Sequence, residues 1–445
     1  MISVTQMEEI LRECLETHAN SKARETGFIQ RERNFSGADF VQMMAFGHLA
    51  HPQSTLDQLT QVAQLQDVQI SRSGLQQRFT ESAATFLQAV LEDLVEHVLA
   101  TEPVEVALLK RFTHVILEDS SSIILPAALE EWWPGCGGNA EGAPGNTEAS
   151  IKLHVRWDVS TGALWGPRLT AGRVSDQSSP FKEDPLPAKS LYVADLGYFS
   201  VQRLVQLQQQ KTFFCLRPKS NTVFWDQHGK KRLPLLNRLP RKEGQTKVIR
   251  VCLGEKQRLA LRLIAVRVPA EVIEQRRKQL EEKACKHGRV VTEQQWEMAQ
   301  WTLILTNAPA KRLGIREAVI LLRERWAIEL LFKLWKSEGQ IDVWRSQHPW
   351  RVLCELYGKV IAMVVQHWFL LLGCWHDPFR SLIKASAIVR EVALECLDRL
   401  SQRQSLAPVS AKLCRMMRSG CRIDRRAAHP CLAQLLLDGL DWSLT

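Results

Sequence analysis

The sequence predicts an α/β protein: a mixed core of strands and helices, interrupted by a strand-rich insertion and flanked by two helical regions. In residues 1–110, apolar residues recur at helical spacing, and Gly and Pro are confined to the joints. From residue 111, short buried strands alternate with a hairpin and a helix. Because 445 residues exceed what one hydrophobic core usually organises, we expect several domains.

The N-terminal region, residues 1–110, contains the stretch "STLDQLTQVAQLQDVQISRSGLQQRF". It predicts a helix over 54–66, a short turn, and a second helix that Ser71 or Ser73 caps. This is the pattern of a helix-turn-helix, whose polar residues at 72–78 would face DNA. Two short helices inside a bundle give the same pattern, so DNA contact and simple packing both remain open here.

The first part of the core, residues 111–217, places acids at predicted strand ends. "FTHVILED" is a buried strand that ends in two carboxylates, and the Gly-rich loop 134–146 leads to a hairpin. "SLYVADLGYF" is a second buried strand, which ends at Asp195. A helix around 199–209 and the strand in "KTFFCLRPK" follow.

The insertion, residues 218–309, reads as three alternating strands and one charged helix, "AEVIEQRRKQLEEKACKHG". The core then resumes over 310–375 with a helix in "RERWAIELLFKLWKS" (323–337), and 376–445 form a helical, basic C-terminal region. The apolar run 360–375 is too short to span a bilayer and predicts a buried helix.

The composition favours a polyanionic partner and a reducing compartment. The net charge is +10, and the isoelectric point is near 9.1. Eleven cysteines are scattered without a CxxC pair, which argues against a disulfide framework or a zinc site and for the cytoplasm. The acidic, amphipathic start is not a signal peptide, so we expect no membrane association.

Glu329 lies among cations on the 323–337 helix. At about 100° per residue, Arg325, Glu329 and Lys336 fall within roughly 40° of one another. One possibility is that the helix carries a solvent-facing ion-pair ladder, Arg325–Glu329–Lys333. Alternatively, it presents a carboxylate and its cations together toward a site.

Three acids then stand out: Asp119, Asp195 and Glu329. Acids at the carboxyl edge of a sheet can converge, and a helix packed there can add a third. Carboxylate oxygens are the ligands that Mg²⁺ prefers, and two such ions can catalyse phosphodiester chemistry. Each Asp taken alone can equally be a cap or a turn residue.

The ordered set resembles the DDE transposases of bacterial insertion sequences, in the IS-four family, over roughly residues 110–375. "EDSSS" and "DLGYF" resemble the segments around that family's two aspartates. The family's signature is Tyr, two residues, Arg, three residues, Glu, six residues, Lys, which Arg325, Glu329 and Lys336 match. Leu322 stands where the signature has Tyr. The resemblance implies an RNase H-like core with a mixed five-stranded sheet.

The resemblance also implies a catalytic site. Asp119, Asp195 and Glu329 would bind two Mg²⁺ ions, for which Mn²⁺ would substitute. The cations of the Glu329 helix would bind DNA phosphates: Arg325, Lys333 and Lys336.

Three further DNA contacts follow from the same resemblance. Arg217 and Lys219 match a DNA-contacting strand after the second Asp. Trp301, 28 residues before Glu329, would stack on a flipped base, although a core Trp at the start of a strand is the alternative. With Leu322 in place of Tyr, one phosphate contact is absent or comes from another residue.

The function implied is cut-and-paste transposition of double-stranded DNA, with hairpin ends, acting on terminal inverted repeats and a target. We expect a homodimer that pairs through 376–445, in a bacterial cytoplasm at the nucleoid. Two rivals remain: a non-catalytic DNA-binding relative or transposition inhibitor, and an RNase H-fold nuclease without strand transfer.

Overall fold

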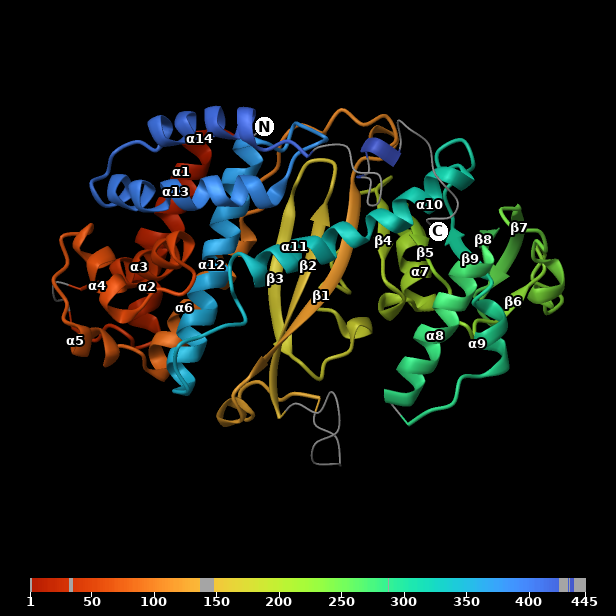
Figure 1. Cartoon of the computed structure of the whole chain (residues 1–445), viewed down its shortest axis with the longest axis horizontal. Coiled ribbons are helices and arrows are strands. Elements are labelled where there is room, and N and C mark those ends of the chain that lie inside the picture. Colours follow the sequence, from red (N-terminus) through yellow and green to blue (C-terminus); the bar gives the residue numbers. More distant parts are fainter. Residues whose placement is uncertain are drawn as a thin grey trace.

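The structure is a computed structural model, and it describes residues 2–31, 35–136, 148–286, 288–423, 431 and 433–435. A helical body lies at one side of the molecule, and a long twisted sheet extends from it across the centre to the opposite side (Figure 1). Most of the predicted Gly-rich loop 134–146 lies outside the described residues, as does the end of the C-terminal region.

Both ends of the chain build the helical body. The N-terminal part provides α1 (Val4–Arg12), a π-helical turn (Glu13–His18), α2 (Ala19–Glu25), α3 (Gly37–Ala50), α4 (Leu56–Gln64), α5 (Arg72–Gln76) and α6 (Glu81–Glu96). The later part provides α12 (Pro349–Gly373), α13 (Leu382–Ser401) and α14 (Ala407–Gly420). Because α3 packs against both α12 and α13, the two ends share one hydrophobic core.

Side-chain caps explain where several of these helices begin. Ser36 accepts from the backbone N–H of Asp39, whose carboxylate accepts in return from Ser36. Ser71 caps α5, as predicted, and α4 matches the helix predicted over 54–66. The second helix of the predicted helix-turn-helix has only five residues.

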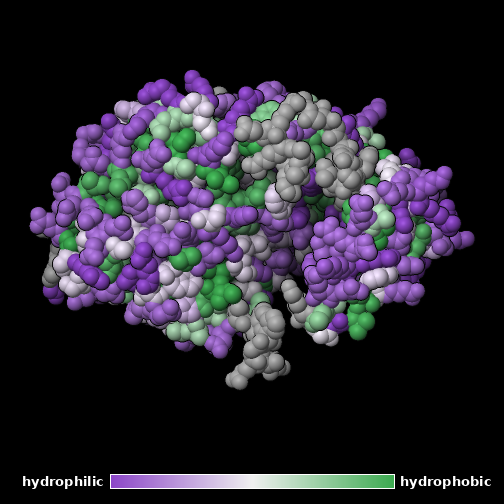
Figure 2. Space-filling model, in the orientation of Figure 1, coloured by the Kyte–Doolittle hydropathy of each residue, from purple (hydrophilic) through white to green (hydrophobic). Residues whose placement is uncertain are grey.

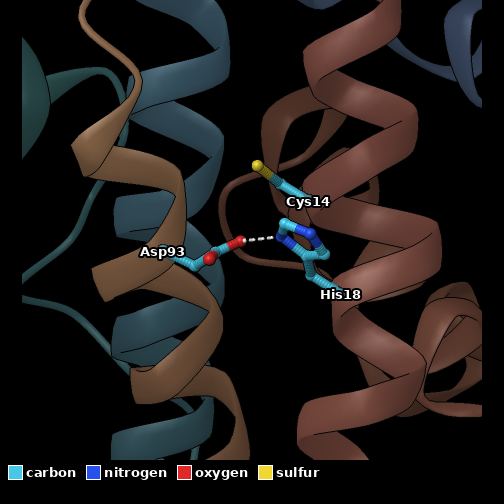
Figure 3. A group of neighbouring side chains, drawn as sticks. All are labelled: Cys14, His18 and Asp93. Atoms are coloured by element: carbon cyan, nitrogen blue, oxygen red, sulfur yellow. Dashed lines mark hydrogen bonds and ion pairs between the residues drawn. The ribbon is translucent and has the colours of Figure 1, made fainter.

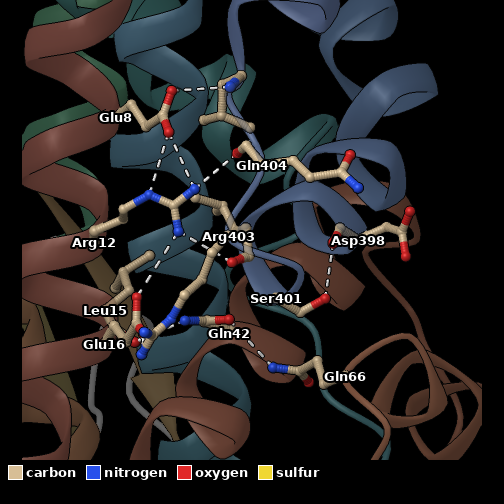
Figure 4. Close-up of polar contacts among 12 residues, drawn as sticks. Glu8, Arg12, Leu15, Glu16, Gln42, Gln66, Asp398, Ser401, Arg403 and Gln404 are labelled. Carbon is tan, nitrogen blue, oxygen red and sulfur yellow. Dashed lines mark hydrogen bonds and ion pairs between the residues drawn. The ribbon is translucent and has the colours of Figure 1, made fainter.

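A polar network joins the first helix to the loop between α13 and α14 (Figure 4). Arg12 pairs with Glu8 at 3.0 Å and donates to the carbonyl of Gln404 at 2.8 Å. Glu8 in turn accepts from the backbone N–H of Leu406 at 2.9 Å. Arg403 reaches Glu16 at 3.2 Å. These contacts fix the N-terminus of the chain against a segment nearly 400 residues later.

The predicted buried helix is confirmed as part of α12, which is longer than the apolar run that predicted it. Its 25 residues would be long and apolar enough to cross a membrane. However, 94% of its most apolar window is buried inside the protein. It therefore forms the central helix of the body, against α3 and α6.

The sheet has nine strands in the order β3-β2-β1-β4-β5-β9-β8-β7-β6. The strands are β1 (Val115–Leu125), β2 (Ala149–Asp158), β3 (Leu164–Ala171), β4 (Leu191–Ala194), β5 (Phe213–Leu216), β6 (Phe224–Trp225), β7 (Thr246–Leu253), β8 (Leu259–Arg267) and β9 (Trp301–Thr306). β4 pairs in parallel with β1 and with β5, and the other pairs are antiparallel.

The expected mixed five-stranded sheet is present as β3-β2-β1-β4-β5, but it is part of this larger sheet. The first five strands do form one side of it, but β9 pairs with the free edge of β5, and β8, β7 and β6 extend the sheet from there. An uncovered strand edge exposes unpaired N–H and C=O groups, and β9 satisfies them here. The insertion thus continues the core sheet.

Two apolar clusters cover the two faces of the sheet. Leu117, Val193 and Cys215 point to the face that α10 (Ile315–Glu324) and α11 (Trp326–Ser337) cover. Their neighbours in each strand point to the other face, where α7 (Val201–Gln209) packs. Helix α7 matches the helix predicted around 199–209. The insertion adds α8 (Ala270–Lys286) and α9 (Glu293–Met298).

Candidate active site

The three predicted acids come from three different elements. Asp119 lies in β1, Asp195 directly follows β4, and Glu329 lies in α11, which packs on β1. The parallel register of β1 and β4 ends at Glu118 opposite Ala194. The next residue of each strand is an aspartate, so Asp119 and Asp195 lie at the same edge of this pairing.

The prediction that Asp119 ends its strand is wrong. β1 continues to Leu125, because β2 pairs with it along its whole remaining length, beyond the point where β4 stops. Asp119 is therefore at the end of the parallel pairing but inside an antiparallel one. Its side chain is held more firmly than that of a strand-end residue, since backbone hydrogen bonds fix β1 on both sides of it.

Glu118, the other acid of the predicted strand end, has a different environment. Its side chain points to the opposite face and is 2% exposed. It accepts from Arg156 Nε at 2.7 Å and from the Ser179 hydroxyl at 2.8 Å. Because both of its oxygens are bonded to buried donors, Glu118 is a structural residue.

Arg325 lies at the centre of the three acids. Its Nη1 is 2.6 Å from Glu329 Oε1 and 4.0 Å from Asp119 Oδ2, and its Nε is 3.8 Å from Asp195 Oδ1. Asp119 Oδ2 and Glu329 Oε1 are therefore near each other, because both lie within 4.0 Å of the same nitrogen atom. The predicted Arg325–Glu329 pair exists, but it faces two further carboxylates and is not a ladder on the solvent side.

The predicted helix over 323–337 is interrupted at Arg325. Helix α10 ends at Glu324 and α11 begins at Trp326. The N–H of Ile328 donates to the carbonyl of Arg325, three residues back, at 3.3 Å, which is a tighter turn than that of an α-helix. Neither Gly nor Pro causes this turn, and it coincides with the ion pairs of Arg325.

The environment of the acid cluster changes the pKa of Asp119. Burial, together with the nearby charges of Asp195 and Glu329, raises the pKa of Asp119 to about 7. A backbone hydrogen bond from Ser120 and the charge of Arg325 act in the opposite direction. The cluster therefore favours a positive charge among its oxygens, and Arg325 supplies one.

The donor set fits divalent cations of the hard type. All three side chains offer carboxylate oxygens, which such ions prefer to nitrogen or sulfur. Among the residues that the structure describes, the oxygens of these three acids do not all lie within 4.8 Å of one another. They surround the guanidinium of Arg325, so a metal-bound arrangement requires that this side chain leave the centre of the cluster.

Two hollows are lined by residues of the acid cluster. One, of about 480 Å³, is lined by Asp119, Glu329, Lys333 and Lys336. Lys336 also donates to the carbonyl of Ser122 at 2.8 Å, which ties α11 to β1. The structure thus brings the two predicted lysines beside the acids, on a surface open enough to admit a phosphate backbone.

The second hollow, of about 210 Å³, is lined by Asp195, Arg217, Leu322 and Arg325. Partial loss of water and the neighbouring charge of Arg325 lower the pKa of the Arg217 guanidinium. Leu322, at the position of the signature Tyr, lies against this basic hollow. A cationic surface therefore continues from the acids along the end of β5.

Two predicted DNA contacts lie away from the acids. Lys219 lines neither hollow. Trp301 packs against the cluster on the opposite face of the sheet, and its indole N–H donates to the carbonyl of Pro240 at 2.7 Å. Arg267 covers its ring at 5.0 Å. Stacking of Trp301 on a flipped base stays a prediction.

Sequence reasoning missed Arg323 and Trp326, which both line the smaller hollow. Trp326 is 48% exposed, and Nη1 of Arg323 is buried without a hydrogen-bond partner. Both lie in the stretch that supplied Arg325 and Glu329. On a continuous helix Trp326 lies about 60° from Glu329, so helical spacing was a signal that could have found it, whereas Arg323 lies about 120° away.

One further cluster among the described residues has metal-ligating side chains: Cys14, His18 and Asp93 (Figure 3). It lies in the helical body. Asp93 accepts from His18 Nδ1 at 2.9 Å and pairs with Lys22 at 3.7 Å. Its carboxylate is thus already balanced by protein groups.

Comparisons with known proteins agree with this geometry. The transposase DDE domain family matches residues 111–365. The transposase for insertion sequence element IS231F of Bacillus thuringiensis subsp. israelensis is 29% identical over 385 residues, covering 80% of this chain and 78% of the relative. The transposase for IS231B of Bacillus thuringiensis subsp. berliner is 27% identical, with the same coverage of each chain. The transposase for IS1151 of Clostridium perfringens is 25% identical, covering 78% of this chain and 76% of the relative.

The family match includes the strands and helices that carry all three acids. A DDE transposase domain has an RNase H-like fold and uses divalent metal ions, in agreement with the mixed sheet and the oxygen donors described above. The match spans more than half of the chain, which therefore belongs to the DDE transposase domain family and is a DNA transposase, an enzyme that cleaves and transfers DNA strands.

Proposed function

We propose that the chain is the transposase of a bacterial insertion sequence of the IS-four family, in the group with the Tyr-Arg-Glu-Lys signature, and that Asp119, Asp195 and Glu329 are its catalytic acids. The observation that carries this proposal is their convergence, from three separate elements, on the guanidinium of Arg325. Insertion-sequence transposases among the relatives support it. Leu322 replaces the signature Tyr in an otherwise matching helix.

The three acids would hold two Mg²⁺ ions, for which Mn²⁺ would substitute. When bound, such ions would supply positive charge to activate the attacking oxygen and to stabilise the leaving oxygen of a phosphodiester. Asp119 resists ionisation, because burial raises its pKa to about 7. It must lose its proton before it ligates, so metal binding strengthens as the pH rises toward that value.

The cations around the acids hold the DNA backbone. Lys333 and Lys336 line one side of the site, and Arg217 lines the other, so phosphates on both sides of the scissile bond meet a positive charge. Arg325 exchanges its carboxylate partners for a phosphate when the site is loaded. Lys219, two residues beyond Arg217, extends this path along the DNA.

The reaction proceeds in steps on double-stranded DNA. Water first cleaves one strand at each terminal inverted repeat and leaves a 3′ hydroxyl, which attacks the opposite strand to form a hairpin. The hairpin is reopened, and the same 3′ ends attack the target DNA. Both ends are handled together by a homodimer, in the bacterial cytoplasm at the nucleoid.

We assign the regions of the chain accordingly. Residues 1–110 form a helical domain with a role in DNA binding, and 111–217 and 310–375 form the catalytic core. Residues 218–309 are the strand-rich insertion, and 376–445 provide the dimer contact. The surface available for that contact includes α13 and α14 on the outside of the helical body (Figure 1).

A cleavage assay tests the catalytic acids. Purified protein is incubated with linear DNA that carries the ends of its element and with Mg²⁺ or Mn²⁺. Asp119→Ala should abolish cleavage and retain DNA binding, because the metal ligand is lost and the cationic surface is not. Glu183→Ala removes an exposed acid outside the site and is the matched control.

The products separate the remaining alternatives. Hairpin-ended or joined products are those of the proposed transposase. Nicks alone identify a nuclease, and a shifted band without cleavage identifies a DNA-binding relative. If Asp119→Ala cuts at the wild-type rate, the assignment of the acids is wrong.

A further inference from the structure

The positive charge of the chain is concentrated at the far end of the sheet. Residues 219–258, here called the basic segment, contain eleven Lys and Arg against three Asp and Glu. This segment therefore carries +8, close to the net charge of +10 of the whole chain. In Figure 2, hydrophilic side chains dominate the lobe at the right, where Figure 1 places β6 to β9 with α8 and α9.

The cations of the basic segment lack acidic partners. Nine of the eleven are exposed, and none of the ion pairs between described residues includes any of the eleven. The rest of the described chain differs, since its exposed cations repeatedly pair with acids, as Lys412 does with Glu395 at 2.9 Å. Unpaired cations repel one another, so a surface that gathers them without acids suits a polyanionic ligand.

The basic segment is also rigidly built. Asp226 accepts from the backbone N–H of Lys230 at 2.8 Å, which fixes the turn that carries Lys230, Lys231 and Arg232. Trp225 pairs with Arg232 in an isolated bridge. Phe224 is buried in the apolar cluster on the face that α7 covers, so the segment is anchored to the sheet. The backbone that carries its cations is therefore held in place before any ligand arrives.

The strand register relates the basic segment to the acids. Cys215 pairs with Thr306, Thr306 with Arg262, and Arg262 with Arg250. Directly paired side chains share a face, so Arg250 projects from the same face of the sheet as the acid site. Four strand spacings of about 4.8 Å separate β4 from β7, or about 19 Å. At about 3.4 Å per base pair, this equals roughly six base pairs of duplex.

We propose that the basic segment is a second DNA-binding surface, which binds the phosphate backbone of duplex DNA about six base pairs or more from the scissile bond. It acts through charge and is indifferent to base sequence, because none of its exposed cations is oriented by a side-chain hydrogen bond of its own among the described contacts. The proposal rests on the family's action on DNA and is independent of which acids catalyse.

Salt-dependent binding to DNA tests this surface. The probe is a labelled mixed-sequence duplex of about 40 base pairs, with a duplex containing the element's end as a second arm, in EDTA so that no cleavage occurs. The variant Lys230→Gln/Lys231→Gln/Arg232→Gln should reduce the slope of log Kd against log salt by about 2 to 3. Each lost phosphate contact should weaken binding by up to about eightfold at 0.1 M salt, equally on both probes.

Two controls sharpen the result. Lys189→Gln/Lys211→Gln/Lys311→Gln removes the same charge from exposed positions that line neither hollow, and it should leave the slope nearly unchanged. Lys230→Arg/Lys231→Arg keeps the charge of the turn and should have the same slope as the wild type.

The outcomes separate this inference from the proposed function. An unchanged slope in the basic-segment variant, or an equal loss in the control variant, overturns the inference while duplex binding by the wild type stands. A loss confined to the probe with the element's end also overturns it, because the surface would then read sequence. The basic-segment variant should still cleave DNA at saturating protein concentration, whereas the Asp119 variant should not.

Discussion

Asp119→Asn should make the metal-free protein more stable at high pH. The pKa of Asp119 is about 7 in the folded protein, against an ordinary value of 3.8 for an aspartate, so the folded state retains a proton that the unfolded state has lost. Stability therefore falls as the pH rises from about 4 to about 7, and the full penalty is present above that range. Three pKa units correspond to an upper limit of about 4 kcal/mol.

The measurement compares denaturant unfolding at pH 5 and pH 8 in EDTA. At both values the unfolded carboxylate is ionised, whereas the folded one loses its proton only between them. The difference in the free energy of unfolding between Asp119→Asn and the wild type should thus grow by about 3 kcal/mol from pH 5 to pH 8. The side chain is only 17% exposed, so solvent screens little of this effect.

Glu183→Gln controls for the loss of one carboxylate, because Glu183 is exposed and away from the site. The reasoning is refuted if the stability difference for Asp119→Asn is the same at both pH values, or if the variant is the less stable protein at pH 8. A gain in stability accompanied by loss of cleavage would show that the residue needed for catalysis lowers the free energy of unfolding.

Three further substitutions have definite expected results. Arg325→Ala should raise the affinity for Mn²⁺ without DNA by about tenfold in calorimetry, since a guanidinium no longer occupies the acid cluster; unchanged affinity would mean that Arg325 does not compete with the ion. Glu118→Gln should lower the free energy of unfolding by about 3 to 5 kcal/mol, because Arg156 remains buried without its charged partner, and a wild-type denaturation midpoint would contradict this. Leu322→Tyr should add a hydroxyl to the hollow beside Arg217 and strengthen binding of the element's ends severalfold in fluorescence anisotropy, and equal or weaker binding would count against that placement.

The approach of the three acids could be predicted from the sequence because it follows from general rules of strand pairing and helical spacing. Parallel strands bring their carboxyl ends to one edge, which places Asp119 near Asp195, and the helical spacing keeps Arg325 with Glu329. Periodicity likewise located α7 and the buried part of α12. The helices depend on residues close together in the chain, and the approach of Asp119 and Asp195 depends on a general rule for parallel strands.

The features that were not predicted depend on contacts between distant segments. The pairing of β5 with β9 joins residues some 90 positions apart, and it turns a separate insertion into a continuation of the sheet. The face to which Trp301 points depends on that same pairing. At the turn, Arg325 forms ion pairs with Asp119 and Asp195, which are more than 100 residues away in the chain. Helix propensity depends on neighbouring residues only, so it could not predict this turn.

The shared helical body has a consequence for synthesis of the chain on the ribosome. Twelve of the fourteen residues of α3 are buried, largely beneath α12 and α13. Translation at about 5 to 20 residues per second leaves α3 without α13 for roughly 20 to 70 seconds. During that interval the nascent protein exposes an apolar helix that chaperones can recognise. A product truncated before α13 should therefore aggregate even though its catalytic core is complete.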